Sequence, residues 1–451
     1  KGLSTIQAQS LSPEQIAGLS TAQIQALSSG SIYALKTEQL DALNISQVKA
    51  LSSNQVSALS SAQINSLSSE SFQAIDAIDF ATLSTATISA LTTKQVSYLT
   101  SSQVSAITST ELGALSTGNL QLLLNAQLNN LTTNAISGLT SSQIQSIDSN
   151  VISQFSSVQI KALDSNQVAA LTSSQINNLG TSQIQSLSID GVGSITTSVF
   201  SAIDSSHIAS LTTSQIQALT STQISNLTAI DGLSTTQISA LNSLQALGLT
   251  TSQSANLLTS SKFGAFTPNA LTKLTTANLG NLTTTQLQSL SSSQIQGLST
   301  SVISSLSSVQ LQGLTTNQIS ALTQSQARSI NFSRLTSTSN IAALPAYDIA
   351  SLEPTTISNL SSSQLQALTS SQIKALKIAQ VQALTTTQIP AITSSQISQL
   401  TADAIKSLTT SQISKLTSTQ INNISESQVS SLTALQLNKI GTAEISKIAV
   451  T

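Results

Sequence analysis

Residues 211–218 read Leu-Thr-Thr-Ser-Gln-Ile-Gln-Ala, and residues 219–226 repeat the pattern as Leu-Thr-Ser-Thr-Gln-Ile-Ser-Asn. Counted from its leucine, this octad has eight positions, and an apolar first position returns every eight residues from Leu3 to Leu227. Shorter or longer units at residues 227–232, 249–257 and 330–335 shift the phase, and the step then continues to Ile448. A fixed period over a whole chain is typical of solenoids. We therefore predict one continuous octapeptide-repeat solenoid over residues 1–451, with phase breaks at 227–232, 249–257 and 330–335.

The placement of proline, hydroxyl and glutamine side chains predicts a short helix that begins at position three of each octad. Pro13, Pro268 and Pro354 stand at position three, and the first residue of a helix tolerates proline. Position two is nearly always Ser or Thr, which are preferred N-caps. Glutamine at position five then lies three residues after the cap, as in a capping box.

These features predict an all-α fold, a superhelical solenoid of very short helices with one helix per octad. Helices this short are not stable alone, because isolated helices need about 12–15 residues. We expect them to stack, with the Leu, Ile or Val, and Ala side chains lining a narrow common core. The alternative is a β-solenoid with two octads per coil, which the many β-branched residues would suit. A strand fits less well, because its period of two would turn either the isoleucine or the following leucine outward.

Composition excludes several classes of function. Charged residues make up 7% of the chain and the net charge is −2, so no face could neutralise a nucleic-acid backbone. Apolar runs stay far below the roughly 20 residues of a membrane-spanning helix, so we expect no membrane insertion of this segment. Cysteine is absent and histidine occurs once, which removes most zinc ligands and cysteine nucleophiles. We expect no catalytic, cofactor-binding or metal-binding residues and no cofactor, and we predict that the chain is not an enzyme.

Three residues are candidates for a functional site. His207 stands at position five, where it could act as a ligand or a base, but we interpret it as a polar substitute that makes the contact of glutamine. Asp76 and Asp79 are paired carboxylates that could perform acid–base chemistry or hold calcium. No Gly-rich calcium loop surrounds them, and Asp76 is in phase as an N-cap, so we favour a structural role for both.

We interpret the phase breaks as kinks or as contacts between subunits. The aromatic residues near them, Phe263, Phe266, Phe332 and Tyr347, would suit a lateral contact. The chain begins at Lys1 and stops inside an octad at both ends, without visible capping repeats. From this we expect a longer array of the same repeats or self-association with other copies.

Tandem units such as Leu368–Ala375, with the pattern Leu-Ser/Thr-x-x-Gln-Ile/Val-x-Ala, resemble those of very large secreted or surface-anchored bacterial repeat proteins described as adhesin-like. The resemblance covers essentially the whole chain. It implies an extracellular or cell-surface location and a structural role as a segment of a fibre, stalk or surface filament. The alternative is an adhesive or surface-binding repeat module that recognises a glycan or ice. Ice recognition is disfavoured, because Ser and Thr interchange freely and one hydroxyl of each octad is used in capping.

Overall fold

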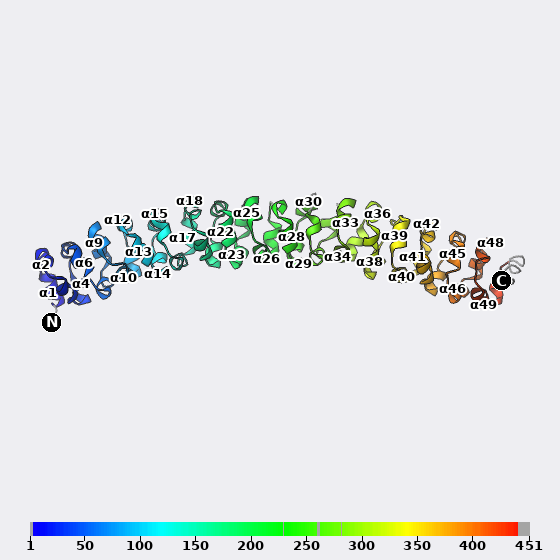
Figure 1. Cartoon of the computed structure of the whole chain (residues 1–451), viewed down its shortest axis with the longest axis horizontal. Coiled ribbons are helices and arrows are strands. Elements are labelled where there is room, and N and C mark those ends of the chain that lie inside the picture. Colours follow the sequence, from blue (N-terminus) through cyan, green and yellow to red (C-terminus); the bar gives the residue numbers. More distant parts are fainter. Residues whose placement is uncertain (1–2, 229, 259–261, 281, 441–451) are drawn as a thin grey trace. The chain divides into compact units, whose positions relative to one another are not determined.

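The computed structural model describes residues 3–228, 230–258, 262–280 and 282–440. The described residues form short helices and no strand (Figure 1). This confirms the all-α prediction and excludes the β-solenoid for the described part of the chain. The chain divides into two compact units, Lys1–Leu233 and Ser234–Thr451. Each unit is described by itself, so one continuous solenoid over residues 1–451 stays a prediction.

The helices of the first unit, with 3₁₀ segments labelled η, are α1 (Thr5–Ser10), α2 (Pro13–Ala17), α3 (Thr21–Gln25), α4 (Ser29–Ala34), α5 (Thr37–Asp41), α6 (Ile45–Lys49), α7 (Ser53–Val56), α8 (Ser61–Ser66), α9 (Ser69–Ala74), α10 (Ala77–Phe80), α11 (Thr85–Ser89), α12 (Thr93–Tyr98), α13 (Ser101–Ala106), α14 (Ser109–Ala114), α15 (Thr117–Gln127), η1 (Leu128–Asn130), α16 (Thr133–Ile136), α17 (Ser141–Ser146), α18 (Ser149–Ile152), α19 (Ser157–Lys161), α20 (Ser165–Ala169), α21 (Ser173–Asn177), α22 (Thr181–Ser186), α23 (Ile189–Ser194), α24 (Thr197–Phe200), α25 (Ser205–Ser210), α26 (Thr213–Ala218), α27 (Ser221–Ser225) and η2 (Ile230–Gly232).

Those of the second unit are α28 (Thr235–Ala240), α29 (Ser243–Leu247), α30 (Thr251–Leu258), η3 (Phe263–Ala265), α31 (Pro268–Leu271), α32 (Thr276–Leu279), α33 (Thr284–Ser289), α34 (Ser292–Gly297), α35 (Thr300–Ser305), α36 (Ser308–Gly313), α37 (Thr316–Ser320), α38 (Gln324–Ser329), α39 (Thr338–Ala343), α40 (Ala346–Ile349), α41 (Pro354–Ser358), α42 (Ser362–Gln366), α43 (Ser370–Lys374), α44 (Ile378–Gln382), η4 (Ile389–Ala391), α45 (Ser394–Ile397), α46 (Ala402–Lys406), α47 (Thr410–Ile413), α48 (Ser418–Ile421), α49 (Glu426–Ser431) and α50 (Ala434–Leu437).

Helix starts lie where the sequence predicts them. In α26, Thr212 is the N-cap in an extended conformation, its side chain accepts from the backbone N–H of Gln215, and the capping box is complete. Pro13, Pro268 and Pro354 are each the first residue of a helix. The octad that begins at Leu123 shows what happens without a capping residue. Leu124 occupies position two, no side chain there can cap a new helix, and α15 continues through this position for a total of 11 residues.

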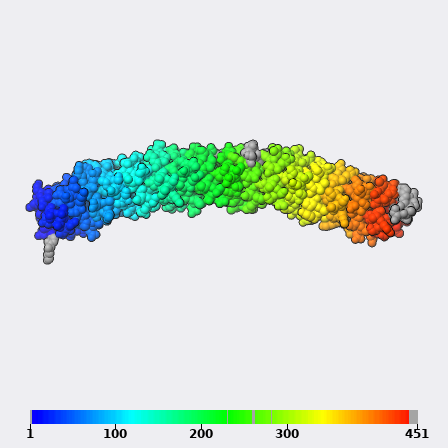
Figure 2. All heavy atoms as spheres, viewed as in Figure 1, coloured from blue at the N-terminus to red at the C-terminus, as the bar shows by residue number. Residues whose placement is uncertain are grey.

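The octads wind so that each helix packs on the helix three octads away. The pairs α9 with α12 and α12 with α15 illustrate this in the first unit, and α33 with α36 and α39 with α42 in the second. In Figure 1, α9, α12, α15 and α18 follow one another along one edge of the first unit. Side chains fill the spaces between these turns (Figure 2). Helices too short to be stable alone are therefore stabilised by the turns before and after them.

The core of each unit is lined by positions one, five and six of the octad. In the octad Leu211–Ala218, Leu211, Gln215 and Ile216 are buried, whereas Ala218 is only half-buried. The expected inward leucine and isoleucine are confirmed. The third inward residue is glutamine and not the alanine that we predicted. Because the glutamine amide is buried, it needs hydrogen-bond partners inside the stack.

The phase breaks preserve the core by local adjustment. In the unit 227–232, η2 replaces the helix, and Ile230 and Leu233 are fully buried with the usual spacing of three residues. The boundary between the two compact units follows immediately. In the unit 249–257 the extra residue is taken up by α30, whose eight residues make it longer than most helices of the chain. In the unit 330–335, Leu335 is fully buried and serves as the first position of the following octad, one residue earlier than the step of eight predicts.

Three of the four aromatic residues expected at a lateral contact lie in the core instead. Phe263, Phe266 and Phe332 are buried, because each occupies position one or a position three residues before it. Phe263 and Phe266 pack edge to face with ring centroids 5.8 Å apart. Tyr347 alone of the four is exposed. The predicted lateral contact on these phenylalanines is therefore wrong. The expectation about capping units rests partly on residues 1–2 and 441–451, which lie outside the described residues.

Candidate functional site

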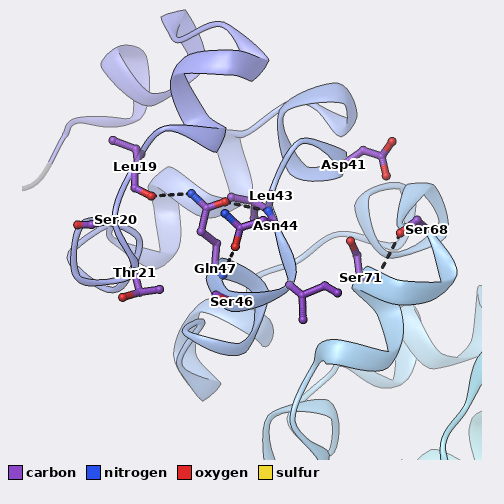
Figure 3. A pocket seen from close by; sticks show the side chains of 11 residues that line it. Leu19, Ser20, Thr21, Asp41, Leu43, Asn44, Ser46, Gln47, Ser68 and Ser71 are labelled. Carbon is purple, nitrogen blue, oxygen red and sulfur yellow. Dashed lines mark hydrogen bonds between the residues drawn. The ribbon is translucent and has the colours of Figure 1, made fainter.

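The feature that recurs through both units is a glutamine at position five that joins two turns. Gln47 is buried between turns, and its Oε1 accepts from the backbone N–H of Asn44, its own N-cap, at 2.8 Å. Its Nε2 donates to the carbonyl oxygens of Ile16 (3.1 Å), Ala17 (3.1 Å) and Leu19 (2.7 Å), between 31 and 28 residues earlier. Figure 3 shows the bond to Leu19 and the two bonds to Asn44. We call this set of contacts the glutamine staple.

The glutamine staple satisfies groups at both ends of a helix. The last four carbonyl groups of a helix have no i+4 partner within it. In these octads the carbonyl of position six lies in the last turn of the helix, and the carbonyl of the next position one follows the helix end, as at Leu112 and Leu115 of α14. Gln143 donates to Leu112 and Leu115, and Gln372 donates to Ile341 and Leu344, in the same register of 31 and 28 residues. The bond at 28 residues joins position five of one octad to position one of the octad three octads earlier, in agreement with the packing of helices three octads apart.

Glutamines that no earlier turn covers among the described residues provide an internal comparison. Gln7, Gln15 and Gln23 form capping boxes like the others, yet all three are exposed. Gln39 is the first whose Nε2 reaches an earlier turn, at the carbonyls of Ala8 (3.0 Å) and Leu11 (2.6 Å), and it is buried. Burial of position five therefore results from stacking and not from the capping box.

His207 makes the contact of glutamine, as its position in the repeat indicated. Its Nε2 lies 3.0 Å from the carbonyl oxygen of Leu179, 28 residues earlier. The ring lines an otherwise apolar pocket that includes Phe200 and Ile208. Donation to a carbonyl requires the proton on Nε2. His207 thus acts as a substitute glutamine in the stack.

Asp76 and Asp79 belong to different contacts. Asp76 is the N-cap of α10 but forms no side-chain cap bond. Asp79 stands at position five, half-buried, and its Oδ1 accepts from the hydroxyl of Ser53 in the preceding turn at 2.5 Å. Among the described residues, no three His, Asp or Glu side chains are grouped so that they could hold a metal ion. The two carboxylates remain interpreted as structural.

The surface carries an open groove between the N-terminal ends of stacked helices (Figure 3). Its volume is about 760 Å³, and hydroxyl groups of Ser20, Thr21, Ser46 and Ser68 line it with the carboxylate of Asp41. A second groove of about 490 Å³ has the same construction, with Thr132, Thr133 and Ser156. Both use positions one to three of one octad and positions two to five of a later octad. The groove is therefore a product of the repeat and not of one irregular site.

Two acidic residues at position five are buried, and sequence reasoning did not single them out. Glu111 is 3% exposed and Asp348 is 1% exposed. Burial raises the pKa of Glu111, against the lowering effect of its hydrogen bonds to Thr108. Burial alone raises the pKa of Asp348 to about 6. The sequence did contain a signal for them. Both are acids in a chain with few charges, and both stand at position five, where the consensus residue is glutamine.

None of the helices in the described residues has both the length and the apolar character needed to cross a membrane. Four segments match the family model of the ALTTAQ repeat, at residues 32–69, 72–109, 144–181 and 341–378. The letters of that description correspond to position eight of one octad and positions one to five of the next. No curated protein sequence matches the chain. The chain is thus a tandem-repeat protein, and four of its segments are similar to the ALTTAQ repeat.

Proposed function

We propose that this chain is a structural segment of an extracellular fibre, stalk or surface filament, and that it is not an enzyme. The observation that carries the proposal is the glutamine staple, which recurs at a register of 28–31 residues in both units. Because each turn contacts only its neighbours, such a stack can be lengthened without a change in its core. A structural role built on a repeat requires the same contribution from one octad after another, which is what the recurring staple provides.

Surface chemistry supports an assembly role. The net charge of −2 leaves little electrostatic repulsion between copies, and the exposed positions are mostly Ser, Thr, Gln and Asn. Only 15 Lys and Arg residues occur in 451, which offers few cleavage positions to trypsin-like proteases. Both properties suit a polymer that persists outside the cell, on a bacterial surface or in its secreted material.

Light scattering of the purified chain over a range of concentrations, with negative-stain microscopy of the same samples, tests the proposal. The expected result is a mass that rises with concentration and rods or filaments that lengthen with it. A monomer at every concentration, with separate short rods in the micrographs, would overturn self-association and favour the second candidate.

The second candidate is an adhesive module that binds a glycan in the groove of Figure 3. The observation in its favour is the recurrence of a hydroxyl-lined groove of similar construction at residues 19–71 and 129–159. Hydroxyl groups can exchange hydrogen bonds with a sugar. The scarcity of aromatic residues, 2% of the chain, argues against it, because no exposed ring lines either groove to stack on a sugar face. Binding of the intact chain to a glycan array, lost in Thr21→Val and Thr133→Val, would support this candidate.

A further inference from the structure

Position five donates hydrogen bonds to the preceding turn where glutamine occupies it, as at Gln47, Gln143 and Gln372. A carboxylate has the same acceptors as a glutamine side chain but no donor unless it is protonated. Among the described residues, position five is acidic at Asp79, Glu111 and Asp348. Asp79 accepts from Ser53, so its charged form is satisfied. Glu111 and Asp348 have no such donor across the turn.

Glu111 preserves the capping half of the glutamine staple. Its Oε2 accepts from the backbone N–H of Thr108 at 2.7 Å and from the hydroxyl of Thr108 at 2.8 Å. Its Oε1 is buried and has no hydrogen-bond partner. The residues 31 and 28 positions earlier are Phe80 and Leu83, whose equivalents in other turns accept from the glutamine Nε2. The second oxygen of Glu111 therefore corresponds to the amide donor.

Asp348 lacks both halves of the staple. Its N-cap is Pro345, which has no backbone N–H and therefore cannot donate a hydrogen bond to the carboxylate. Both Oδ1 and Oδ2 are buried without a hydrogen-bond partner. One octad before it, Asn340 also occupies position five and donates to the carbonyls of Leu311 (3.1 Å) and Leu314 (3.2 Å). By the same register, Asp348 is aligned with the carbonyls of Ile319 and Leu322.

In the described part of the chain, no charged side chain on the helices packed against α14 or α40 forms an ion pair with Glu111 or Asp348. Helices α11 and α16, which pack on α14, carry no charged residue, and α10 carries only Asp79. Against α40 pack α38 and α43. In α38, Arg328 donates its Nε to the carbonyl of Ser351 at 2.8 Å, and in α43 Lys374 is exposed. The one ion pair found in the described residues joins Lys36 and Glu38.

We propose that Glu111 and Asp348 form acid-dependent joints in the stack. In the protonated form, each acid donates its O–H to a carbonyl of the preceding turn and closes the joint. When the carboxyl group releases its proton to water, a negative charge faces carbonyl oxygens in a buried site, and the two turns separate locally. The raised pKa values of both groups agree with this arrangement. These two positions of the described array thus open as pH rises, while the glutamine staples around them stay closed.

Hydrogen exchange measured by mass spectrometry on the full chain, at about pH 5 and about pH 7.5, tests the joints. After correction for intrinsic exchange rates, we expect faster exchange at the higher pH in peptides that cover residues 80–83 and 107–115, and in those that cover 319–322 and 344–352. Because pH 5 lies above the unfolded pKa, the expected change between the two pH values is about tenfold for each unit by which the folded pKa exceeds 5. Peptides around Gln143, in a glutamine-stapled turn, should show no such change.

Matched variants separate the joints from general effects of pH. Glu111→Gln restores the consensus staple without a change of shape, and Asp348→Asn restores a donor. Each variant should abolish the pH dependence of its own joint and leave the other unchanged. Glu70→Gln changes an exposed acid at position four and should alter neither joint. Equal protection of the wild-type joints at both pH values, or a pH dependence that persists in Glu111→Gln, would overturn the proposal.

Discussion

The side-chain nitrogen of Gln143 lies 2.8 Å from the carbonyl oxygen of Leu115, 28 residues earlier in the chain. The same side chain accepts through Oε1 from the backbone N–H of Thr140 at 2.8 Å. One amide group therefore completes the start of its own helix and the end of a helix in the preceding turn. This double use explains why a polar residue recurs at an inward position of a repeat with a core of aliphatic side chains.

Replacement of Gln143 by alanine should open its turn. The change removes the side-chain donor from the carbonyls of Leu112 and Leu115. Leu112 keeps the backbone N–H of Leu115, so it is the buried carbonyl of Leu115 that loses its donor, at a cost of about 1–3 kcal/mol in the free energy of local opening. Hydrogen exchange of residues 112–115 and 139–146 measures it. Gln145→Ala provides the matched control, because this exposed glutamine of the same octad should tolerate the change with little effect. Equal effects of the two substitutions would show that the staple contributes nothing to stability.

Leu139→Asp should disrupt the stack locally. Leu139 is 3% exposed at position one, so aspartate there is either a buried unpaired charge or a protonated acid with a raised pKa. The expected loss is about 3 kcal/mol or more, seen as rapid proteolysis near α17. Ser141→Asp changes an exposed residue at the start of the same helix, where a negative charge is favourable. Similar proteolysis of both variants would contradict the assignment of the inward face.

Gly138→Val should be strongly destabilising because two turns meet closely at this residue. A Cβ atom at Gly138 would lie 1.9 Å from the backbone oxygen of Ser109, so the backbones would have to separate. Overpacking of this kind typically costs about 1–3 kcal/mol. Gly118→Ala is the control: nothing lies within 4 Å of its Cβ, and alanine in helix α15 should stabilise by about 0.5–1 kcal/mol. Thermal denaturation followed by far-UV circular dichroism distinguishes the two directions.

The stability of the turn that contains Asp348 should fall as pH rises. Its folded pKa of about 6 exceeds the ordinary aspartate pKa of 3.8, so between these pH values the folded state holds a proton that the unfolded state has released. The stabilisation is fully present below about pH 4 and lost by about pH 6, and amounts to roughly 2–3 kcal/mol. Asp348→Asn should remove this slope in the local opening free energy measured by hydrogen exchange. A slope of opposite sign would mean that the carboxylate has a donor in the folded state.

Local chemistry in the sequence determined where each helix begins. Ser or Thr at position two and glutamine at position five define a capping box that needs no partner outside eight residues, and Gln15 forms it although no earlier turn among the described residues covers it. The same reasoning gave position one and position six as inward, since Leu211 and Ile216 lie on one face of the helix. Two further effects are also local. Proline at position three begins a helix, as at Pro13, and leucine at position two lets a helix continue, as at Leu124.

Only the tertiary structure decided how many octads make one turn and which groups meet between turns. An octad contains no information about the residue 28 positions away, because that distance depends on the angle at which successive short helices pack. The burial of Gln47, the contact of His207 with Leu179 and the closeness of Gly138 to Ser109 all follow from that angle. The unpaired oxygens of Glu111 and Asp348 follow from it as well, since an acid at position five lacks a donor only when an earlier turn covers it.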